Sequence, residues 1–160
     1  MRYRERSMKV VFLDFDGVLN TFALIRADGR PLDRLDPAAV ARLNAIVSRS
    51  GAKVVISSSW RVHRPLDELR AMLAELGFTG EVIDRTPELE VSLYGDPFIT
   101  RGQEIQAWID AQAEPLESYV ILDDAYLEEA AQFLVKTETA AGLLDEHVAL
   151  ALEILGELPQ

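Results

Sequence analysis

The 160-residue sequence has no cysteine and only two histidines. Without cysteine the chain cannot form a disulfide framework, a thiolate metal site or a cysteine nucleophile. Long hydrophobic runs are also lacking, because the first apolar run extends only from Val10 to Leu13, too short for a signal peptide or a membrane span. Nothing here argues for secretion, so we expect a cytoplasmic protein that acts away from membranes.

Positive charge is scarce and unevenly distributed. The sequence has 16 Lys and Arg residues but 27 Asp and Glu. The resulting net charge of −11 argues against a general nucleic-acid coat protein. Residues 1–64 nevertheless carry 12 basic and 6 acidic side chains, whereas residues 65–160 carry 4 and 21. Two interpretations stay open: an anionic substrate approaches the basic half, or the halves are differently solvated faces.

Length and composition indicate one domain. A chain of 160 residues with 49% hydrophobic residues can bury a substantial core. We therefore predict a single domain over residues 1–160, in which residues 1–7 form a flexible lead-in and Met8 is an alternative start.

Apolar runs of strand length alternate with amphipathic helical stretches. The predicted strands cover residues 10–13, 53–56, 81–84, 119–122 and 133–135; helices are predicted between Asp36 and Gly51, over 66–76, after the capping-box pattern of Thr100 and Gln103, over 127–131, and after a cap at Asp145. This alternation predicts an α/β fold with a doubly wound, mainly parallel five-stranded Rossmann-like sheet. Asp28-Gly29 predicts a small β flap over 21–34, and residues 85–99 indicate an irregular loop.

Three of the predicted strands end on polar side chains. These are Asp14 and Asp16 after the first strand, Ser57, Ser58 and Ser59 after the second, and Asp123 and Asp124 after the fourth. Ligands bind at the carboxyl ends of parallel strands, so four carboxylates are expected to converge there. At about 4 Å and an effective dielectric near 20, each pair would repel by roughly 4 kcal/mol. Oxygen-only ligands favour Mg²⁺ as the ion that removes this cost.

Each motif alone also has a plain structural interpretation. The Asp-Phe-Asp-Gly stretch could be a solvated loop, Asp123-Asp124 a helix cap, and the serines a polar strand-to-helix turn. The combination of the motifs, in this order, favours a site.

The four motifs together resemble those of the haloacid dehalogenase (HAD) superfamily of phosphotransferases, over nearly the whole chain. In this chain Asp14-Phe15-Asp16-Gly17 is similar to motif one and Ser57 to motif two. Arg101 is similar to motif three, and Asp123-Asp124 to motif four. The family more often has lysine at the position of Arg101, and many members have threonine at that of Val18.

The resemblance implies a magnesium-dependent phosphomonoester hydrolase. Asp14 would be the nucleophile that forms an aspartyl-phosphate, and Asp16 would protonate the leaving oxygen and then activate water. Asp14, the Asp16 carbonyl and Asp124 would hold Mg²⁺, and Asp123 would support the metal shell. The expected phosphate- or substrate-binding residues are Ser57, Ser58, Arg101 and Arg61.

The layout lacks the cap domain that many relatives insert, so the site is expected to be open and suited to a large substrate. The stretch from Ile56 to Arg61 looks similar to phosphatase domains associated with bacterial nucleic-acid repair, including polynucleotide kinase-phosphatases. We therefore expect a nucleic-acid terminal phosphate as substrate and no obligate protein partner. Contacts to a nucleic-acid backbone could come from Arg26, Arg30, Arg34, Arg61 and Arg64.

Other functions stay open. The chain could be a small-molecule phosphatase, for example of nucleotides, with the 85–99 loop as a lid. A phospho-accepting receiver would use Asp84 as acceptor, but it would want Ser or Thr where Asp123 stands. A non-catalytic binding module would need one of the motif carboxylates to be missing, and none is. Among the neighbouring residues we expect Trp60 to pack, His63 to lie in a solvated turn or take part in catalysis, and His147 to be structural.

Overall fold

The computed structural model describes residues 7–21, 34–89 and 100–157. Almost all of the expected lead-in and of the predicted flap, and most of the 85–99 loop, therefore lie outside the described residues. Within the described part, no helix is both long enough and apolar enough to cross a bilayer.

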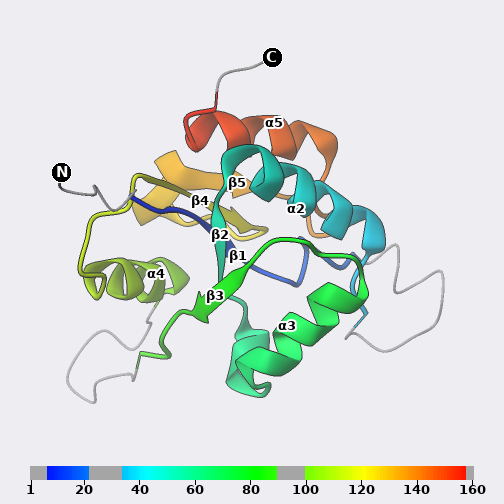
Figure 1. Ribbon diagram of the computed structural model, residues 1–160, viewed down its shortest axis with the longest axis horizontal. Helices are drawn as coiled ribbons and strands as arrows, with labels where there is room; N and C mark the ends of the chain where they lie inside the picture. Colours follow the sequence, from blue (N-terminus) through cyan, green and yellow to red (C-terminus); the bar gives the residue numbers. More distant parts are fainter. Residues whose placement is uncertain (1–6, 22–33, 90–99, 158–160) are drawn as a thin grey trace, which may run out of the picture.

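A parallel sheet of five strands forms the centre of the molecule (Figure 1). The strands are β1 (Lys9–Leu13), β2 (Lys53–Ile56), β3 (Val82–Arg85), β4 (Ser118–Asp123) and β5 (Leu134–Lys136). Their order across the sheet is β3-β2-β1-β4-β5, and every pair is parallel. This confirms the predicted Rossmann-like α/β fold, and no cap domain is present among the described residues.

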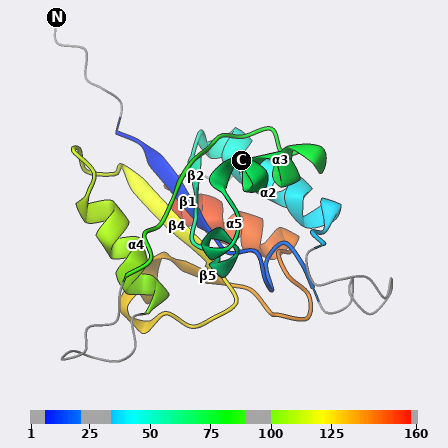
Figure 2. The same ribbon diagram turned by 90° about the horizontal axis from the view of Figure 1, so that it is seen from below.

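Helices cover both faces of the sheet, as Figure 2 shows from below. One face packs against α2 (Pro37–Ser50), α3 (Leu66–Glu75) and α5 (Asp145–Ile154), and the other against α4 (Arg101–Asp110) and the 3₁₀ helix η2 (Glu128–Phe133). Strand β1 is buried on both sides, because Val11 and Leu13 belong to the first core and Val10 and Phe12 to the second. The continuous apolar run in the sequence follows from this double coverage.

Two helix starts follow the sequence signals. The Asp36 carboxylate accepts a hydrogen bond from the Ala38 N–H at 2.9 Å, and Pro37 occupies the first position of α2. At α4 the hydroxyl of Thr100 and the side chain of Gln103 form the predicted capping box. Both arrangements satisfy N–H groups that have no partner inside the helix.

The predicted cap of the last helix is wrong. Asp145 is the first residue of α5 rather than its cap, and its carboxylate accepts from Arg42 Nε at 2.9 Å. The Leu144 N–H donates to Nδ1 of His147 instead, at 2.8 Å. The buried imidazole of His147, the third residue of α5, therefore accepts from the N–H of the residue before the helix, whereas an aspartate cap would accept from N–H groups of the first turn.

This difference predicts unequal effects for two substitutions in α5. His147→Ala should lower the free energy of unfolding by about 1 kcal/mol or more, because it leaves the Leu144 N–H without its acceptor. Asp145→Ala should lower it by less than about 0.5 kcal/mol, because the ion pair with Arg42 is solvent-exposed. Urea denaturation of both variants measures the difference, and equal or reversed effects would contradict the assignment.

Candidate active site

The sheet reverses its strand order between β1 and β4, so the two strands lie at a topological switch point. Leu13 pairs with Ile56 of β2 on one side and with Leu122 of β4 on the other. The backbone continues this alignment, because the Asp14 N–H donates to the Leu122 carbonyl at 3.0 Å. The ends of the three strands carrying motifs one, two and four therefore lie side by side.

Because side chains alternate between the two faces of a strand, the motif side chains point to the same face of the sheet. Leu13, Ile56 and Leu122 all belong to the core under α2 and α5. The residue that follows each of them in the chain therefore lies on the opposite face, where α4 begins. These residues are Asp14, Ser57 and Asp123. Carboxylate oxygens of Asp14, Asp123 and Asp124 lie within 4.8 Å of one another. We call these three residues the acidic cluster.

Arg101, the first residue of α4, supplies positive charge to the acidic cluster. Its Nη1 atom lies 3.1 Å from Oδ2 of Asp14 and 2.6 Å from Oδ2 of Asp123. Burial alone would disfavour the guanidinium charge, but the two carboxylates outweigh it and raise the pKa of Arg101. A permanent cation in a first helical turn opposes the helix dipole, and the buried acids explain its placement.

One guanidinium does not balance the buried negative charge. Asp14 is 3% exposed, and its Oδ1 accepts from the Phe15 N–H at 2.9 Å. Burial, with the added repulsion from Asp123, nevertheless raises the pKa of Asp14 to about 7, against the opposing effect of Arg101. The site therefore carries more negative than positive charge, and a further cation would stabilise the ionised acids.

Gly17 lets the motif-one loop pass close to Asp124. Its φ of +75° is a conformation that residues with a side chain rarely adopt, and a Cβ atom there would lie 2.2 Å from Oδ2 of Asp124. Two hydroxyls hold the same junction: Thr139 donates to Oδ2 of Asp124 at 2.8 Å, and Thr137 donates to the Gly17 carbonyl at 2.7 Å. The loop after β1 and the segment after β5 thus fix the position of Asp124.

The side chain of Asp16 lies outside the acidic cluster and is exposed. Its carboxylate accepts from Nε1 of Trp60 at 3.1 Å to each oxygen, and Oδ1 also accepts from Nδ2 of Asn20 at 2.8 Å. Asp14 and Asp16, two residues apart, therefore have different surroundings. The expected metal contact of the Asp16 carbonyl remains a prediction.

The serines after β2 differ in their bonding. Ser57 is fully buried, and its hydroxyl has no hydrogen-bond partner among the described residues. The same is true of the buried hydroxyl of Thr86 after β3. Ser58 accepts from the Trp60 N–H at 3.2 Å and so caps the 3₁₀ helix η1 (Ser59–Val62). An unpaired buried hydroxyl is costly unless a ligand completes it, which favours Ser57 over Ser58 as a ligand contact.

Arg61 has a role within the protein, and its expected contact with substrate stays a prediction. Its guanidinium is buried, and each of its nitrogens already has a partner within the protein. The acceptors are the carbonyls of Ser57, Ser58, Thr86 and Pro87, together with the carboxylate of Glu104 at 2.9 Å. Arg61 therefore ties the ends of β2 and β3 to α4, as its planar fork of donors allows.

Sequence reasoning missed the hydrogen bonds that support the motif residues. Trp60 does pack, with its ring edge-on to Phe15 at 5.2 Å between centroids, but it also donates to Asp16. Asn20 gave no signal beyond being a polar residue near motif one, and the two threonines after β5 are distant from every motif in the sequence. His63 is exposed, and the side chain of Arg64 lies over the Trp60 ring at 4.6 Å.

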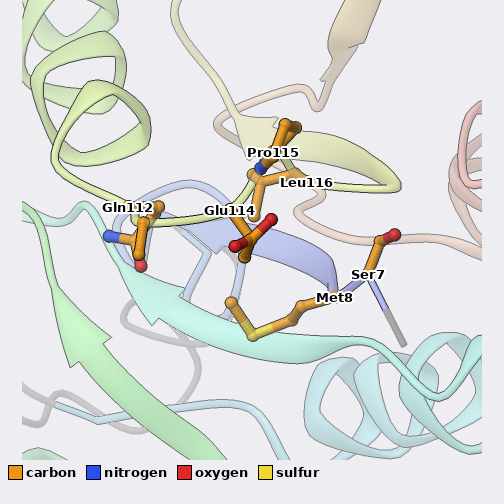
Figure 3. Close-up of a pocket in the computed structure, with 7 residues that line it drawn as sticks. Ser7, Met8, Gln112, Glu114, Pro115 and Leu116 are labelled. Atoms are coloured by element: carbon orange, nitrogen blue, oxygen red, sulfur yellow. The ribbon is translucent and has the colours of Figure 1, made fainter. Parts of the chain in front are cut away.

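A pocket at the other end of the sheet has no comparable chemistry. It lies between the start of β1 and the segment before β4, where Figure 3 shows Glu114 beside Met8 and Leu116. Its lining residues are Ser7, Met8, Gln112, Ala113, Glu114, Pro115 and Leu116, of which only Glu114 ionises. We therefore place the functional site at the acidic cluster.

Comparison with known families agrees with this placement. A family model that describes the HAD domain in Swiss Army Knife RNA repair proteins matches residues 10–148, which include all four motifs. The chain belongs to this family of HAD domains. No significant match was found among curated proteins or among solved structures.

Membership confirms the resemblance to the HAD superfamily and to its nucleic-acid repair branch. It supports a hydrolase of the HAD type with a phosphatase or repair role, and HAD domains typically use Mg²⁺. The acidic cluster of this HAD domain fits such an ion, because it offers oxygen ligands only, within a few ångströms, in surroundings short of positive charge.

Gly17→Ala tests the metal site, with Gly51→Ala as a matched control. Both glycines have a φ near +70°, so each alanine should lower the free energy of unfolding by about 1–2 kcal/mol. Only the Cβ at position 17 meets Asp124, because nothing lies within 4 Å of a Cβ at Gly51. Mg²⁺ should therefore raise the melting temperature of the wild type and of Gly51→Ala, but much less that of Gly17→Ala. Equal stabilisation of all three proteins would contradict the proposed position of the metal.

Proposed function

We propose that this HAD domain is a magnesium-dependent phosphatase that removes a terminal phosphate from RNA through an aspartyl-phosphate on Asp14. The observation that supports it most directly is the acidic cluster, where Asp14 lies beside two further carboxylates and one guanidinium. Its position at the switch point of the sheet is where α/β proteins bind ligands.

Asp14 is held in one orientation, as a nucleophile requires. Oδ1 accepts from the Phe15 N–H and Oδ2 faces Arg101, so that both oxygens are restrained. In the first half-reaction a carboxylate oxygen forms a bond to phosphorus while the bond from phosphorus to the ester oxygen breaks, and Asp16 gives a proton to the leaving oxygen. In the second, Asp16 takes a proton from water, which attacks phosphorus and releases inorganic phosphate from Asp14.

The remaining groups would hold the phosphate and its charge. Asp14, Asp124 and the Asp16 carbonyl would hold Mg²⁺, which shields the phosphoryl oxygens from the attacking carboxylate. The hydroxyl of Ser57, which has no partner in the described part of the chain, would donate to a phosphoryl oxygen. Arg101 would share its positive charge between the acids and the incoming phosphate.

Two features favour an RNA end over a small metabolite. In the described residues the connection from β2 to α4 consists of η1, α3 and β3, none of them a cap domain. Tyr126 follows Asp124 by two residues and is 67% exposed, so its ring is available to stack against a base next to the phosphate. The description of the matching family, RNA repair, points to the same class of substrate.

A panel of phosphoesters tests the activity. With Mg²⁺ the wild type should release phosphate from RNA oligomers carrying a 3′- or a 5′-phosphate faster than from mononucleotides, sugar phosphates or phosphopeptides. Asp14→Asn should lose at least about 10³-fold in kcat, because an amide cannot act as the nucleophile. Chelation of Mg²⁺ should have a similar effect. Preference for a mononucleotide would favour the nucleotide-phosphatase alternative, and inactivity on every ester would exclude catalysis of this kind.

Tyr126→Ala tests the RNA end specifically. Loss of one stacking contact should raise KM for a phosphorylated RNA oligomer about tenfold, while KM for 4-nitrophenyl phosphate, which has no neighbouring base, should change little. Leu150→Ala is the control, because it truncates a half-exposed apolar side chain of α5, on the other face of the sheet. An unchanged KM for RNA would remove the stacking argument while leaving the phosphatase chemistry intact.

A further inference from the structure

We propose that Trp60 is a positioning residue for Asp16, through its indole N–H, and that it acts on the departure of the leaving group. The inference rests on the proposed phosphatase function and adds to it a residue that none of the four motifs contains. It starts from one contact: Nε1 of Trp60 lies 3.1 Å from both oxygens of the Asp16 carboxylate.

Asp16 depends on side chains for its orientation. The backbone N–H of Phe15 fixes Asp14, whereas the Asp16 carboxylate is exposed and receives its hydrogen bonds from Trp60 and from Asn20. An exposed carboxylate without such donors would sample several rotamers. General-acid catalysis needs the carboxyl group within hydrogen-bond distance of the leaving oxygen, and a small misplacement lowers the rate strongly.

Trp60 is itself held firmly. Its side chain is 8% exposed, its ring packs edge-on to Phe15, and the Arg64 guanidinium lies over it at 4.6 Å from the ring centre. Its backbone N–H is bonded to the hydroxyl of Ser58, which begins η1. The donor is therefore rigidly attached both to the loop after β1, where Asp16 lies, and to the strand end that carries Ser57.

The hydrogen bonds from Trp60 leave Asp16 able to transfer a proton. A carboxylate has about four acceptor positions, and one shared N–H uses only part of them. The N–H shared by both oxygens, together with Nδ2 of Asn20 on Oδ1, restrains the orientation of the carboxylate, while its exposed side stays open to the leaving group. Loss of the N–H should then affect the step in which the leaving oxygen needs a proton.

The dependence on leaving group separates this role from a structural one. An alkyl phosphate or an RNA 3′-phosphate releases a poor leaving group that needs protonation, whereas 4-nitrophenyl phosphate releases a stable anion. The constant kcat/KM reports only steps up to the first irreversible one, which here is phosphoenzyme formation, so later hydrolysis does not mask the effect. Trp60→Phe keeps an aromatic ring and removes the N–H.

Trp108→Phe is the matched control. Trp108 is the second of the two tryptophans in the chain, is 5% exposed, packs edge-on to Phe12 and donates its own Nε1 to the Asp84 carboxylate at 2.7 Å. The same chemical change is thus made at an indole that contacts neither the acidic cluster nor Asp16. Both variants should lose similar amounts of thermal stability.

We expect Trp60→Phe to lower kcat/KM for the RNA 3′-phosphate about 10- to 100-fold and that for 4-nitrophenyl phosphate at most about threefold, with Trp108→Phe changing neither selectively. Equal losses on both esters, or none on either, would overturn the inference. If Trp60→Phe does not fold, 3-benzothienylalanine, which replaces the N–H by sulfur, is incorporated in place of tryptophan in the Trp108→Phe background. A wild type inactive on both esters would instead contradict the proposed function itself.

Discussion

The interaction on which the rest of the site depends is the repulsion among three carboxylates at the carboxyl ends of two adjacent strands. Asp14 and Asp123 are buried, Asp124 is partly buried, and their oxygens lie within 4.8 Å of one another. At such separations each pair repels by roughly 4 kcal/mol at an effective dielectric near 20. A protein keeps such an arrangement when it uses the charge, and the surroundings are built to hold it. The register between β1 and β4 places Asp14 and Asp123 side by side, and Gly17 leaves space for Asp124. One nitrogen of Arg101 contacts both Asp14 and Asp123.

Helix α4 connects this cluster to the rest of the sheet through one stripe of side chains. Arg101 contacts the acids, Glu104 one turn later pairs with the buried Arg61, and Trp108 a further turn on donates to Asp84. Residues three and four apart share a face of a helix, so all three point toward the sheet, with Arg101 at the site and Trp108 two turns away from it. The helix that packs against the second core through Ile105 thereby also sets the charges of the site. Fold and site are coupled, because displacing α4 would leave both a buried acid pair and a buried guanidinium without partners.

The sequence predicts the sheet and the positions of the motifs well, for a physical reason. A doubly covered strand such as β1 must be apolar throughout, and the residue at which it stops must lie at the sheet edge. What sequence could not supply is the direction of long side chains after the strands end. Arg61 looked available to substrate, but it turns inward to four carbonyls and Glu104. Trp60 looked like a packing residue and proves also to be a donor to Asp16. Asp145 looked like the cap of α5, but it is the first residue of that helix, and the buried His147 accepts from the Leu144 N–H. The contacts of Trp60 with Asp16 and of Arg61 with Thr86 and Glu104 join residues distant in the chain, so no local pattern encodes them.

The two aspartates of motif one illustrate how one short segment can carry two roles. Asp14 continues the strand, is fixed by a backbone N–H and a guanidinium, and has a pKa raised to about 7 by burial together with Asp123. Asp16 lies past the strand end, is exposed, and receives its hydrogen bonds in the described structure from the side chains of Trp60 and Asn20. Pairs of carboxylates in contrasting environments are the usual basis for dividing chemical roles between them. Here the contrast arises within three residues, because the chain leaves the buried sheet between the first aspartate and the second. In the proposed mechanism the nucleophile therefore depends on the integrity of the sheet, whereas the acid depends on an indole that follows the neighbouring strand.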